Sequence, residues 1–304
     1  MLAFVLEVDD TAALREIPCP QPGPGEVLIR VRTSALNPHD DHVRSGLARA
    51  YLDYDLPAVL GTDVAGEIVA AGEGVRRAAV GDRVFGLERS FRVHRGTFAE
   101  YVALPEAAVA KTPENVADAD AGALGLASLT ALKAIDAARL EPGETILING
   151  ATGGVGCYAT QLAAASGARV LATARPGDEA DLMRALGAAA VIDWSAEDVG
   201  AAAARGGGVD VLLDLVNFDP RALDALAERT LVAGGRALTT VAPESGAQMI
   251  VSTSAPELID RIAEHAARGE LSVHVRASFA LADVEHAFAA LRAGGVGKIG
   301  LRVS

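Results

Sequence analysis

Asn149-Gly-Ala-Thr-Gly-Gly-Val-Gly156 is the stretch of this 304-residue sequence that decides the fold. It follows an apolar run at 145–149, which reads as a strand, and it opens an Ala-rich segment over about 154–166, which reads as a helix. A tight turn here points backbone N–H groups and a helix N-terminus at one place, which suits a pyrophosphate. Gly153 lets the backbone approach the phosphates, Gly156 allows the helix to pack closely on the strand, and Ala151 stands where the usual pattern has its first glycine.

Alternating strands and helices around this turn favour a dinucleotide site over an ordinary strand-to-helix turn. Further strands are expected at 169–174, 190–193, 209–214 and 236–241, with helices near 178–186, 195–204, 220–231 and 255–268. This alternation is typical of βαβ units with a parallel sheet. The residues predicted to bind the diphosphate of a nicotinamide dinucleotide are Ala151, Thr152, Gly153, Gly154, Val155 and Gly156.

The end of the second strand of these repeats decides between NAD and NADP. NAD sites place Asp or Glu there, whereas this strand ends in Thr173-Ala174-Arg175. Thr173 and Arg175 can donate hydrogen bonds to a 2′-phosphate, the arginine with the help of its charge. Asp178 and Glu179 follow closely, where acidic side chains favour the start of a helix. NADPH is therefore the predicted cofactor, and a solvated surface position is the alternative for Arg175.

The first third of the chain is predicted to be β-rich. The alternating segment at 26–32 follows a turn at 22–25, and short strands are expected at 64–70 and 82–85. Short strands separated by glycine indicate a compact, partly closed β domain. The tail over 279–303 is predicted to carry a short helix and a final strand and to return to this domain.

Composition narrows the functional classes. Half of the residues are hydrophobic, aromatic residues make up 4%, and the formal net charge is −13. Such a chain suits a packed α/β protein of two domains and repels phosphate backbones and anionic lipids, so neither nucleic acid nor membrane is an expected partner. The sequence shows neither a signal peptide nor an apolar run of about 18 residues. A cytoplasmic location is predicted, with Cys19 and Cys157 as separate thiols rather than a disulfide.

Further landmarks follow one another along nearly the whole chain. They are Pro24-Gly-Glu-Val-Leu-Ile-Arg-Val31, Leu36-Asn-Pro-His-Asp40, Leu60-Gly-Thr-Asp-Val-Ala-Gly66, Gly81-Asp-Arg-Val-Phe85, Gly96-Thr-Phe-Ala-Glu-Tyr101 and Gly297-Lys298. Together with the glycine-rich turn, they resemble the medium-chain dehydrogenase/reductase superfamily and, within it, the zinc-free quinone oxidoreductases. The resemblance implies an α/β protein with a GroES-like β domain over 1–120 and 268–304 and a doubly wound, parallel-sheet Rossmann domain over 121–267. It also implies an active site in the cleft between the domains, and a homodimer formed by joining the nucleotide-domain sheets edge to edge.

Zinc-dependent relatives use thiolate and imidazole ligands, together with a four-cysteine lobe. In this sequence Asn37 stands where the ligand Cys would be and Thr62 where the ligand His would be, and two cysteines cannot build the lobe. His39, His42 and His94 form no recognisable ligand set, so no metal is expected. Without a metal Lewis acid, the accessible chemistry is hydride transfer from NADPH to an already electrophilic acceptor, such as a quinone or an enone.

By resemblance, Asn37, His42 and Thr130 lie near the nicotinamide. Asn37 can hydrogen-bond the acceptor oxygen or the cofactor ribose. His42 occupies a position that is Tyr in much of the family, and it either donates a proton to a quinone oxygen or enolate, or only lines the pocket or faces solvent. Val241 and Ala242, at the end of the last strand of the repeats, are expected to bound the nicotinamide.

The remaining charged residues of this region have alternative interpretations. Asp40 and Arg44 either pair with each other or contact the substrate. Asp63 replaces the usual Glu beside the lost zinc site and is expected to hold an Arg or a backbone amide. Lys298, which matches the family's Gly-Lys, either contacts the cofactor or a carboxylate, or lies on the surface.

The sequence thus predicts an NADPH-dependent oxidoreductase that transfers hydride to a quinone without zinc. Reduction of enones or enoyl substrates, alkenals included, is the close alternative because it uses the same hydride geometry. A protein of another class that binds NADPH without turnover would need the same glycine-rich turn.

Overall fold

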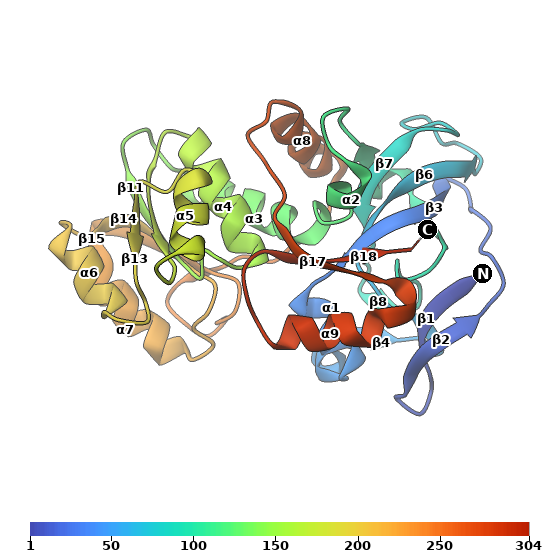
Figure 1. Cartoon of the computed structure of the whole chain (residues 1–304), viewed down its shortest axis with the longest axis horizontal. Helices are drawn as coiled ribbons and strands as arrows, with labels where there is room; N and C mark the ends of the chain where they lie inside the picture. Colours follow the sequence, from blue (N-terminus) through green and yellow to red (C-terminus); the bar gives the residue numbers. More distant parts are fainter. Residues whose placement is uncertain (304) are drawn as a thin grey trace. The chain divides into compact units, whose positions relative to one another are not determined.

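The computed structural model describes residues 1–303, which divide into two compact units (Figure 1). Unit 1 comprises Met1–Leu129, Thr253–Gly269 and the tail from Val273, and unit 2 comprises Thr130–Ser252 and Glu270–Ser272. Helix α8 (Pro256–Ala267) packs on strand β10 and therefore belongs to unit 1, whereas the domain boundaries near 120 and 268 stay predictions.

Unit 2 is built around a parallel sheet with the strand order β13-β12-β11-β14-β15-β16. Figure 1 shows α4 and α5 on one side of this sheet and α6 and α7 on the other. The strand order reverses between β11 and β14, as in a doubly wound fold. The elements are β11 (Thr145–Asn149), α4 (Gly154–Ala165), β12 (Arg169–Thr173), α5 (Asp178–Ala185), β13 (Ala190–Ile192), α6 (Val199–Arg205), β14 (Val209–Asp214), α7 (Pro220–Thr230), β15 (Leu231–Thr239) and β16 (Gln248–Met249), with α3 (Gly125–Ala138) running through the point where the units divide.

The central strand of this sheet is covered on both faces. Ile146, Leu147 and Ile148 of β11 are fully buried. Ile146 is in register with Val170 of β12 on one side and with Val211 of β14 on the other. This burial explains why the strand is an uninterrupted apolar run, and the predicted Rossmann domain is confirmed.

Two elements of unit 2 differ from the predicted bounds. Helix α6 begins at Val199 rather than near 195, because the Asp198 carboxylate accepts a hydrogen bond from Ala201 N at 2.6 Å and caps the helix. Strand β15 begins at Leu231, directly after α7, and ends at Thr239.

Unit 1 contains the predicted β domain. Its larger sheet has the order β10-β7-β6-β3-β18-β17, with β9 also pairing with β3, and it is accompanied by the smaller sheets β2-β1-β5 and β4-β8. The strands are β1 (Leu2–Leu6), β2 (Ala12–Glu16), β3 (Glu26–Leu36), β4 (Asp53–Tyr54), β5 (Ala58–Val59), β6 (Asp63–Ala71), β7 (Arg83–Leu87), β8 (Arg92–Val93), β9 (Tyr101–Pro105), β10 (Val109–Lys111), β17 (Val275–Ala280) and β18 (Lys298–Arg302). Its other helices are α1 (Pro38–Arg44), α2 (Asp118–Ala121) and α9 (Val284–Arg292), with short 3-10 turns η1 (Leu47–Ala50), η2 (Glu106–Ala108) and η3 (Leu281–Asp283).

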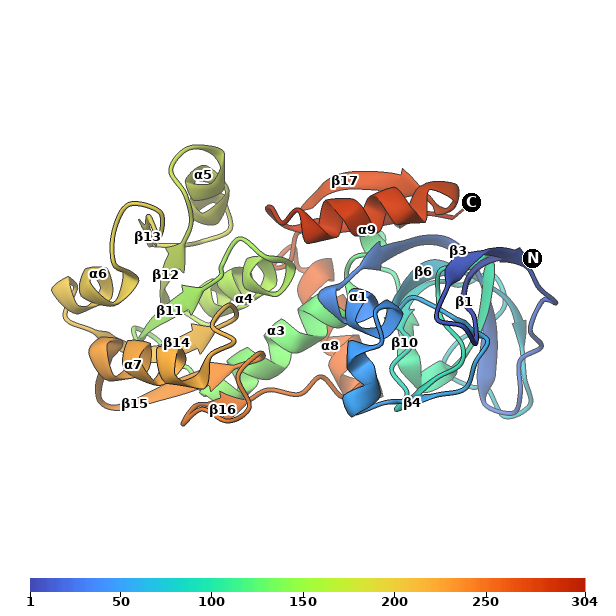
Figure 2. The same ribbon diagram turned by 90° about the horizontal axis from the view of Figure 1, so that it is seen from below.

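The C-terminal tail returns to this domain, as predicted. Strand β18 pairs antiparallel with β3, Ile299 opposite Leu36, and β3 therefore continues past its predicted end at 32. Helix α9 lies alongside β17 and β18 (Figure 2). Its fully buried Phe288 packs with ring centroids 6.1 Å from those of Phe4 and Phe98, so the tail is part of the core.

Among residues 1–303, the structure has no helix with the length and apolarity needed to span a bilayer.

Candidate functional site

The glycine-rich turn of unit 2 has the geometry of an anion-binding loop. Gly150 adopts a φ of 91°, in the left-handed region that favours glycine. The first hydrogen bond of α4 runs from Cys157 N to Gly153 O at 2.9 Å, so the N–H groups of 154–156 have no acceptor within the helix. A Cβ at Gly153 would meet only Gly150 O, at 3.5 Å, which leaves the space over this end of the helix open to a phosphate.

The last glycine of the turn fixes how closely α4 approaches it. A Cβ at Gly156 would lie 2.4 Å from Gly150 O and 2.5 Å from the Cα of Ala151. No side chain fits there without a backbone shift. The turn and the helix N-terminus therefore form one packed unit, and these residues fit the diphosphate of a dinucleotide.

Two buried polar side chains hold this turn in place. Thr173 Oγ1 accepts a hydrogen bond from Gly150 N at 2.8 Å, and Asp214 accepts one from Asn149 Nδ2 at 2.7 Å. Thr173 is 2% exposed, and its hydroxyl is also 3.4 Å from Ile148 O. Its hydroxyl is thus engaged inside the protein, which differs from the predicted contact with a 2′-phosphate.

Arg175 lies beyond the tip of β12, with its side chain more than half exposed. It pairs with Glu179 at 2.6 Å, and this hydrogen bond raises the pKa of the guanidinium above its usual value. Asp178 and Glu179 form the first turn of α5, as predicted. The guanidinium also lies 5.9 Å from the ring centroid of Trp194. A 2′-phosphate that bound the Arg175 guanidinium would do so beside the Glu179 carboxylate, which already pairs with it.

The other predicted residues of unit 2 differ in exposure. Ala151, Ala174 and Ala242 are buried and could contact a cofactor only through the backbone, whereas Thr152, Gly154, Val155 and Val241 are partly exposed. The backbone N–H groups of Val241 and Ala242 donate hydrogen bonds to Thr239 Oγ1, at 3.1 and 3.3 Å. Thr130 is 6% exposed and shares a hydrogen bond with the Ser252 hydroxyl.

A second group of buried polar residues lies in unit 1, where β3, β6, β18 and α1 come together. Lys298 Nζ donates to Asn37 Oδ1, to Leu36 O at 3.2 Å and to Asp63 Oδ2 at 3.1 Å. Asn37 Nδ2 donates to Asp63 Oδ2 at 3.0 Å, and Asp63 Oδ1 accepts from Leu126 N at 2.6 Å. Lys298, Asn37 and Asp63 are at most 5% exposed. We call these three residues the amide network.

Asp40 extends the amide network on α1. Its Oδ2 accepts from Asn37 N at 2.7 Å, and its Oδ1 accepts from the Thr62 hydroxyl, also at 2.7 Å. Burial raises the pKa of Asp40 to about 6, against the effect of the Thr62 hydrogen bond, and the nearby Asp63 carboxylate adds to the rise. Asp40 is therefore a buried carboxyl that changes charge near neutral pH.

Three sequence-based pairings can now be judged. The pairing of Asp40 with Arg44 is wrong, because Arg44 binds Glu285 at 2.7 Å. Asp63 holds a backbone amide, as expected, but its cationic partner is Lys298 rather than an arginine. Lys298 is not a surface lysine, and its contact with a carboxylate is confirmed.

The donor set of this region does not fit zinc. The groups at the positions of the family's ligands are the Asn37 amide and the Thr62 hydroxyl, and the cation among them is an ammonium. Zinc sites are built from thiolate, imidazole and carboxylate ligands. The amide network contains neither a thiolate nor an imidazole. Within residues 1–303, no three His, Cys, Asp or Glu side chains converge in a way that could hold a metal ion.

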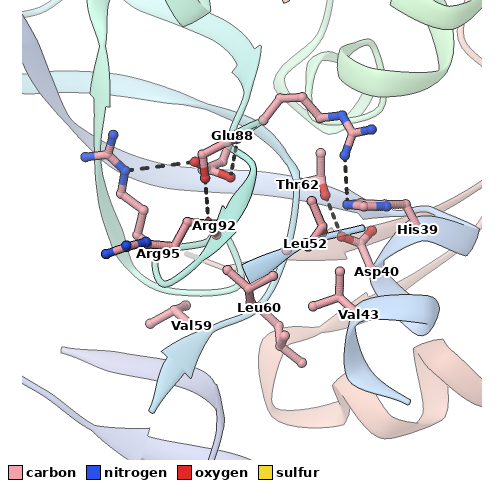
Figure 3. Close-up of a pocket in the computed structure, with 14 residues that line it drawn as sticks. His39, Asp40, Val43, Leu52, Val59, Leu60, Thr62, Glu88, Arg92 and Arg95 are labelled. Atoms are coloured by element: carbon pink, nitrogen blue, oxygen red, sulfur yellow. Dashed lines mark hydrogen bonds and ion pairs between the residues drawn. The ribbon is translucent and has the colours of Figure 1, made fainter. Parts of the chain in front are cut away.

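A small polar cavity lies beside Asp40 and Thr62 (Figure 3). His39 and Arg89 line it, with Arg89 Nη1 3.0 Å from His39 Nε2. Burial lowers the pKa of His39 to about 4, and the charge of Arg89 adds to the effect, so the ring is neutral at pH 7. The cavity of about 30 Å³ holds about two water molecules and is too small for a quinone.

Sequence reasoning missed the His39–Arg89 contact and the part that Asp40 takes in the network. His39 and Arg89 are 50 residues apart, and no spacing pattern links them. The closeness of Asp40 to Asn37 in the sequence was the one available signal. His42 lies in the last turn of α1 and is partly buried, and its role as a proton donor stays a prediction.

Comparison with known proteins identifies the family. Residues 23–114 match the alcohol dehydrogenase GroES-like domain, and residues 154–239 match the zinc-binding dehydrogenase family. The chain belongs to the medium-chain dehydrogenase/reductase family of oxidoreductases. This confirms the predicted fold class and the prediction that the protein is an oxidoreductase of this family.

Curated relatives include reductases of two kinds. A chloroplastic quinone-oxidoreductase of Triphysaria versicolor is 38% identical over 185 residues, which cover 59% of this chain and 55% of that protein. A 2-methylene-furan-3-one reductase of Solanum lycopersicum is 32% identical over 298 residues, which cover 95% of this chain and 73% of that protein. The chain thus spans about half the length of the chloroplastic quinone oxidoreductase that it matches.

Solved structures of the same fold cover the whole chain. An NAD-dependent alcohol dehydrogenase has a TM-score of 0.89 at 29% identity, with 100% of both chains covered. A quinone oxidoreductase from Coxiella burnetii has a TM-score of 0.85 at 27% identity, covering 100% of this chain and 98% of that one. A mycobacterial protein in complex with NADPH has a TM-score of 0.83 at 27% identity, again with 100% of both covered. Members of this family bind a nicotinamide cofactor.

Two separate glycine-to-alanine substitutions in the turn should distinguish effects on cofactor binding from effects on folding. Gly153→Ala creates only an ordinary contact within the protein but places a methyl group where a diphosphate would lie, so we expect the Kd for NADPH to rise about tenfold with an unchanged unfolding midpoint. Gly156→Ala pushes α4 away from the turn and should cost about 1–3 kcal/mol of stability. Fluorescence titration and urea unfolding measure the two effects. Wild-type affinity in Gly153→Ala would contradict a diphosphate at this turn.

The buried Asp40 should make stability depend on pH. Its pKa is about 6 in the folded protein against an ordinary value of 3.8, so the folded state binds more protons between these pH values. The stability that this carboxyl contributes is complete below about pH 4 and is lost as the pH rises through 6. Asp40→Asn should therefore gain stability relative to the wild type, by at least ~1 kcal/mol, between pH 4.5 and 7.5. Urea unfolding across this range tests it, with Asp41→Asn as the neighbouring control; parallel curves for wild type and Asp40→Asn would contradict it.

Proposed function

We propose that the protein is an NADPH-dependent oxidoreductase that transfers hydride to a quinone without zinc. The amide network carries this proposal. At the positions of the zinc ligands in zinc-dependent relatives, this chain has the Asn37 amide and the Thr62 hydroxyl. Beside them, the Lys298 ammonium is paired with the Asp63 carboxylate. Zinc-dependent relatives use the metal as a Lewis acid to stabilise the alkoxide of an alcohol, whereas a quinone is electrophilic by itself.

NADPH, when bound, supplies the hydride from its nicotinamide ring. The part of this chain is to hold the cofactor. The N–H groups at 154–156 bind its diphosphate, Arg175 donates charge-assisted hydrogen bonds to the 2′-phosphate, and Val241 and Ala242 bound the nicotinamide. Several local donors are needed because a net charge of −13 repels a polyanionic ligand.

A quinone that accepts hydride needs one proton to become the hydroquinone. We assign this proton to His42, which is partly buried on α1 and whose imidazole can donate a proton to a quinone oxygen. Thr130 completes the residues that we place at the reacting centre. The homodimer and the cytoplasmic location stay predictions.

Reduction of an enone is the second candidate. The tomato relative, whose name describes reduction of a 2-methylene-furan-3-one, aligns with 95% of this chain and supports it. Hydride then goes to the β-carbon of the enone, and the proton goes to the resulting enolate. Both candidates need the same cofactor geometry and differ in the acceptor.

Steady-state oxidation of NADPH by the purified protein with a panel of quinones and enones tests the proposal. We expect turnover with both classes to survive metal chelation, with the higher kcat/KM for quinones. A higher value for enones would favour the second candidate. NADPH binding without turnover on any acceptor would leave the non-catalytic NADPH-binding protein, and stoichiometric zinc in the purified protein would contradict zinc independence.

The cofactor preference should depend on Arg175. Arg175→Ala removes the proposed donor to the 2′-phosphate, so we expect the Kd for NADPH to rise about tenfold while that for NADH stays within about twofold. Arg184→Ala, which removes a similarly exposed arginine from α5, serves as the control. Equal losses for both cofactors would show that Arg175 does not read the 2′-phosphate.

A further inference from the structure

A second cavity lies within unit 1, where helix α8 packs beside the outer strand β10 of the larger sheet (Figure 2). Its buried side is formed by Val84 of β7 and by Val109 and Ala110 of β10. Ala263 lines it from α8. The cavity has a volume of about 340 Å³, which lies within the range of pockets that hold small molecules.

Two polar contacts attach α8 to the rest of unit 1, one on either side of Ala263. The Arg77 guanidinium donates to both carboxylate oxygens of Asp260, at 2.9 and 3.0 Å. Further along α8, Ala266 O accepts a hydrogen bond from Asn115 Nδ2 at 2.9 Å. Ala263 stands between these attachments and carries only a methyl group, so the space beside it stays open. A ligand therefore meets a cavity that is already formed, which lowers the cost of binding.

The two cations that line the cavity already have anionic partners. Arg77 is bound in the bidentate ion pair with Asp260, and Lys111 Nζ lies 3.0 Å from the Asp82 carboxylate. An anionic ligand at either cation would have to compete with that carboxylate and would lie close to it. Juxtaposed like charges oppose binding, so the cavity disfavours an anionic ligand.

Glu264 is the charged group of the cavity whose ion pair is the longest. Its carboxylate lies 4.0 Å from Arg268 Nη1, and its side chain is 66% exposed. Arg268 also lies within 3.1 Å of His265 Nδ1. Because Glu264 follows Asp260 by about one helical turn, both carboxylates lie on the same face of α8. Together with a net charge of −13 for the chain, they favour a positively charged ligand.

We propose that this cavity is a binding site for a small organic ammonium ion. The ammonium pairs with the Glu264 carboxylate at the exposed rim, and the apolar part of the ligand lies on Val84, Val109 and Ala110. All the residues that line the cavity belong to unit 1, whereas the glycine-rich turn belongs to unit 2. The inference goes beyond the proposed function and does not depend on which cofactor or acceptor the protein uses.

Probes of similar shape and different charge test this inference. 2-Phenylethylammonium, 2-phenylethanol and 3-phenylpropanoate are each titrated into the ¹⁵N-labelled protein, and the amide NMR signals are followed. We expect 2-phenylethylammonium to bind with a Kd of ~1 mM, as suits a small ligand with one charged contact, and at least about fivefold more tightly than the other two probes. The amide shifts should be largest at 109–111 and 260–264.

Two variants and their matched controls locate the ligand. Ala263→Leu fills the cavity with a residue that suits a helix, so the Kd for 2-phenylethylammonium should rise at least about tenfold; Ala267→Leu, at an exposed alanine of the same helix, is the control. Glu264→Gln removes the charge and should raise the same Kd about threefold, with Glu257→Gln as the exposed control on α8. Unfolding midpoints are measured in parallel.

Four results would overturn the inference. Equal or tighter binding of 3-phenylpropanoate would show that the cavity does not select a cation. Wild-type affinity in a folded Ala263→Leu variant would place the ligand elsewhere. The Glu264 side chain is exposed, so Glu264→Gln leaves the core intact, and wild-type affinity there would contradict the ion pair even if Ala263→Leu folded poorly. Unchanged amide signals at 260–264 with about 10 mM 2-phenylethylammonium, well above the expected Kd, would show that the site does not exist.

Discussion

A buried ammonium paired with a buried carboxylate is the constraint on which unit 1 depends. Lys298 and Asp63 join the start of β18 to the start of β6, and their other hydrogen bonds reach the end of β3 and the first turn of α3. Burying two charges costs free energy that Coulomb attraction alone seldom returns. Such a pair persists where hydrogen bonds satisfy its remaining atoms, as the amide network does here. Its effect is to fix the starts of β18, β6 and α3 and the end of β3 relative to one another.

The glycine-rich turn imposes a comparable constraint on unit 2, by close packing rather than by charge. Gly156 allows α4 to lie directly against Gly150 and Ala151, and the Thr173 hydroxyl holds the turn from β12. The N–H groups at the start of α4 are thereby fixed before any ligand arrives. Preorganised donors cost little to align, which matters in an acidic chain whose overall field opposes an anionic cofactor.

The sequence alone was sufficient to predict an element of the fold where the pattern that indicates it lies in neighbouring residues. Strand β11, the turn after it and α4 follow from one contiguous stretch, because apolar runs, glycine turns and helix starts are written in neighbouring residues. The hydrogen bond that the Thr173 hydroxyl accepts from Gly150 N was not predicted, since a threonine at the end of a strand can bind a ligand or its own loop equally well. Lys298 could not be placed, because its partners Asn37 and Asp63 lie 261 and 235 residues away and the burial of a lysine follows from that pairing alone. The pairing of Asp40 with Arg44, one of the two alternatives for these residues, fails for the same reason: their short separation in the sequence suggested it, but Arg44 binds Glu285 of the distant tail.

The nature of the resident cation limits the chemistry open to this family member. A metal ion accepts a lone pair from a substrate oxygen and so lowers the energy of an alkoxide directly. An ammonium has no empty orbital and acts only through its charge and its N–H donors, and at Lys298 all three donors are directed at the protein itself. Its positive charge is balanced within the protein by the Asp63 carboxylate. The Lys298 ammonium therefore cannot act as a Lewis acid for an alkoxide in place of a metal ion, and this is the physical reason why the proposed acceptor is one whose carbon is already electrophilic.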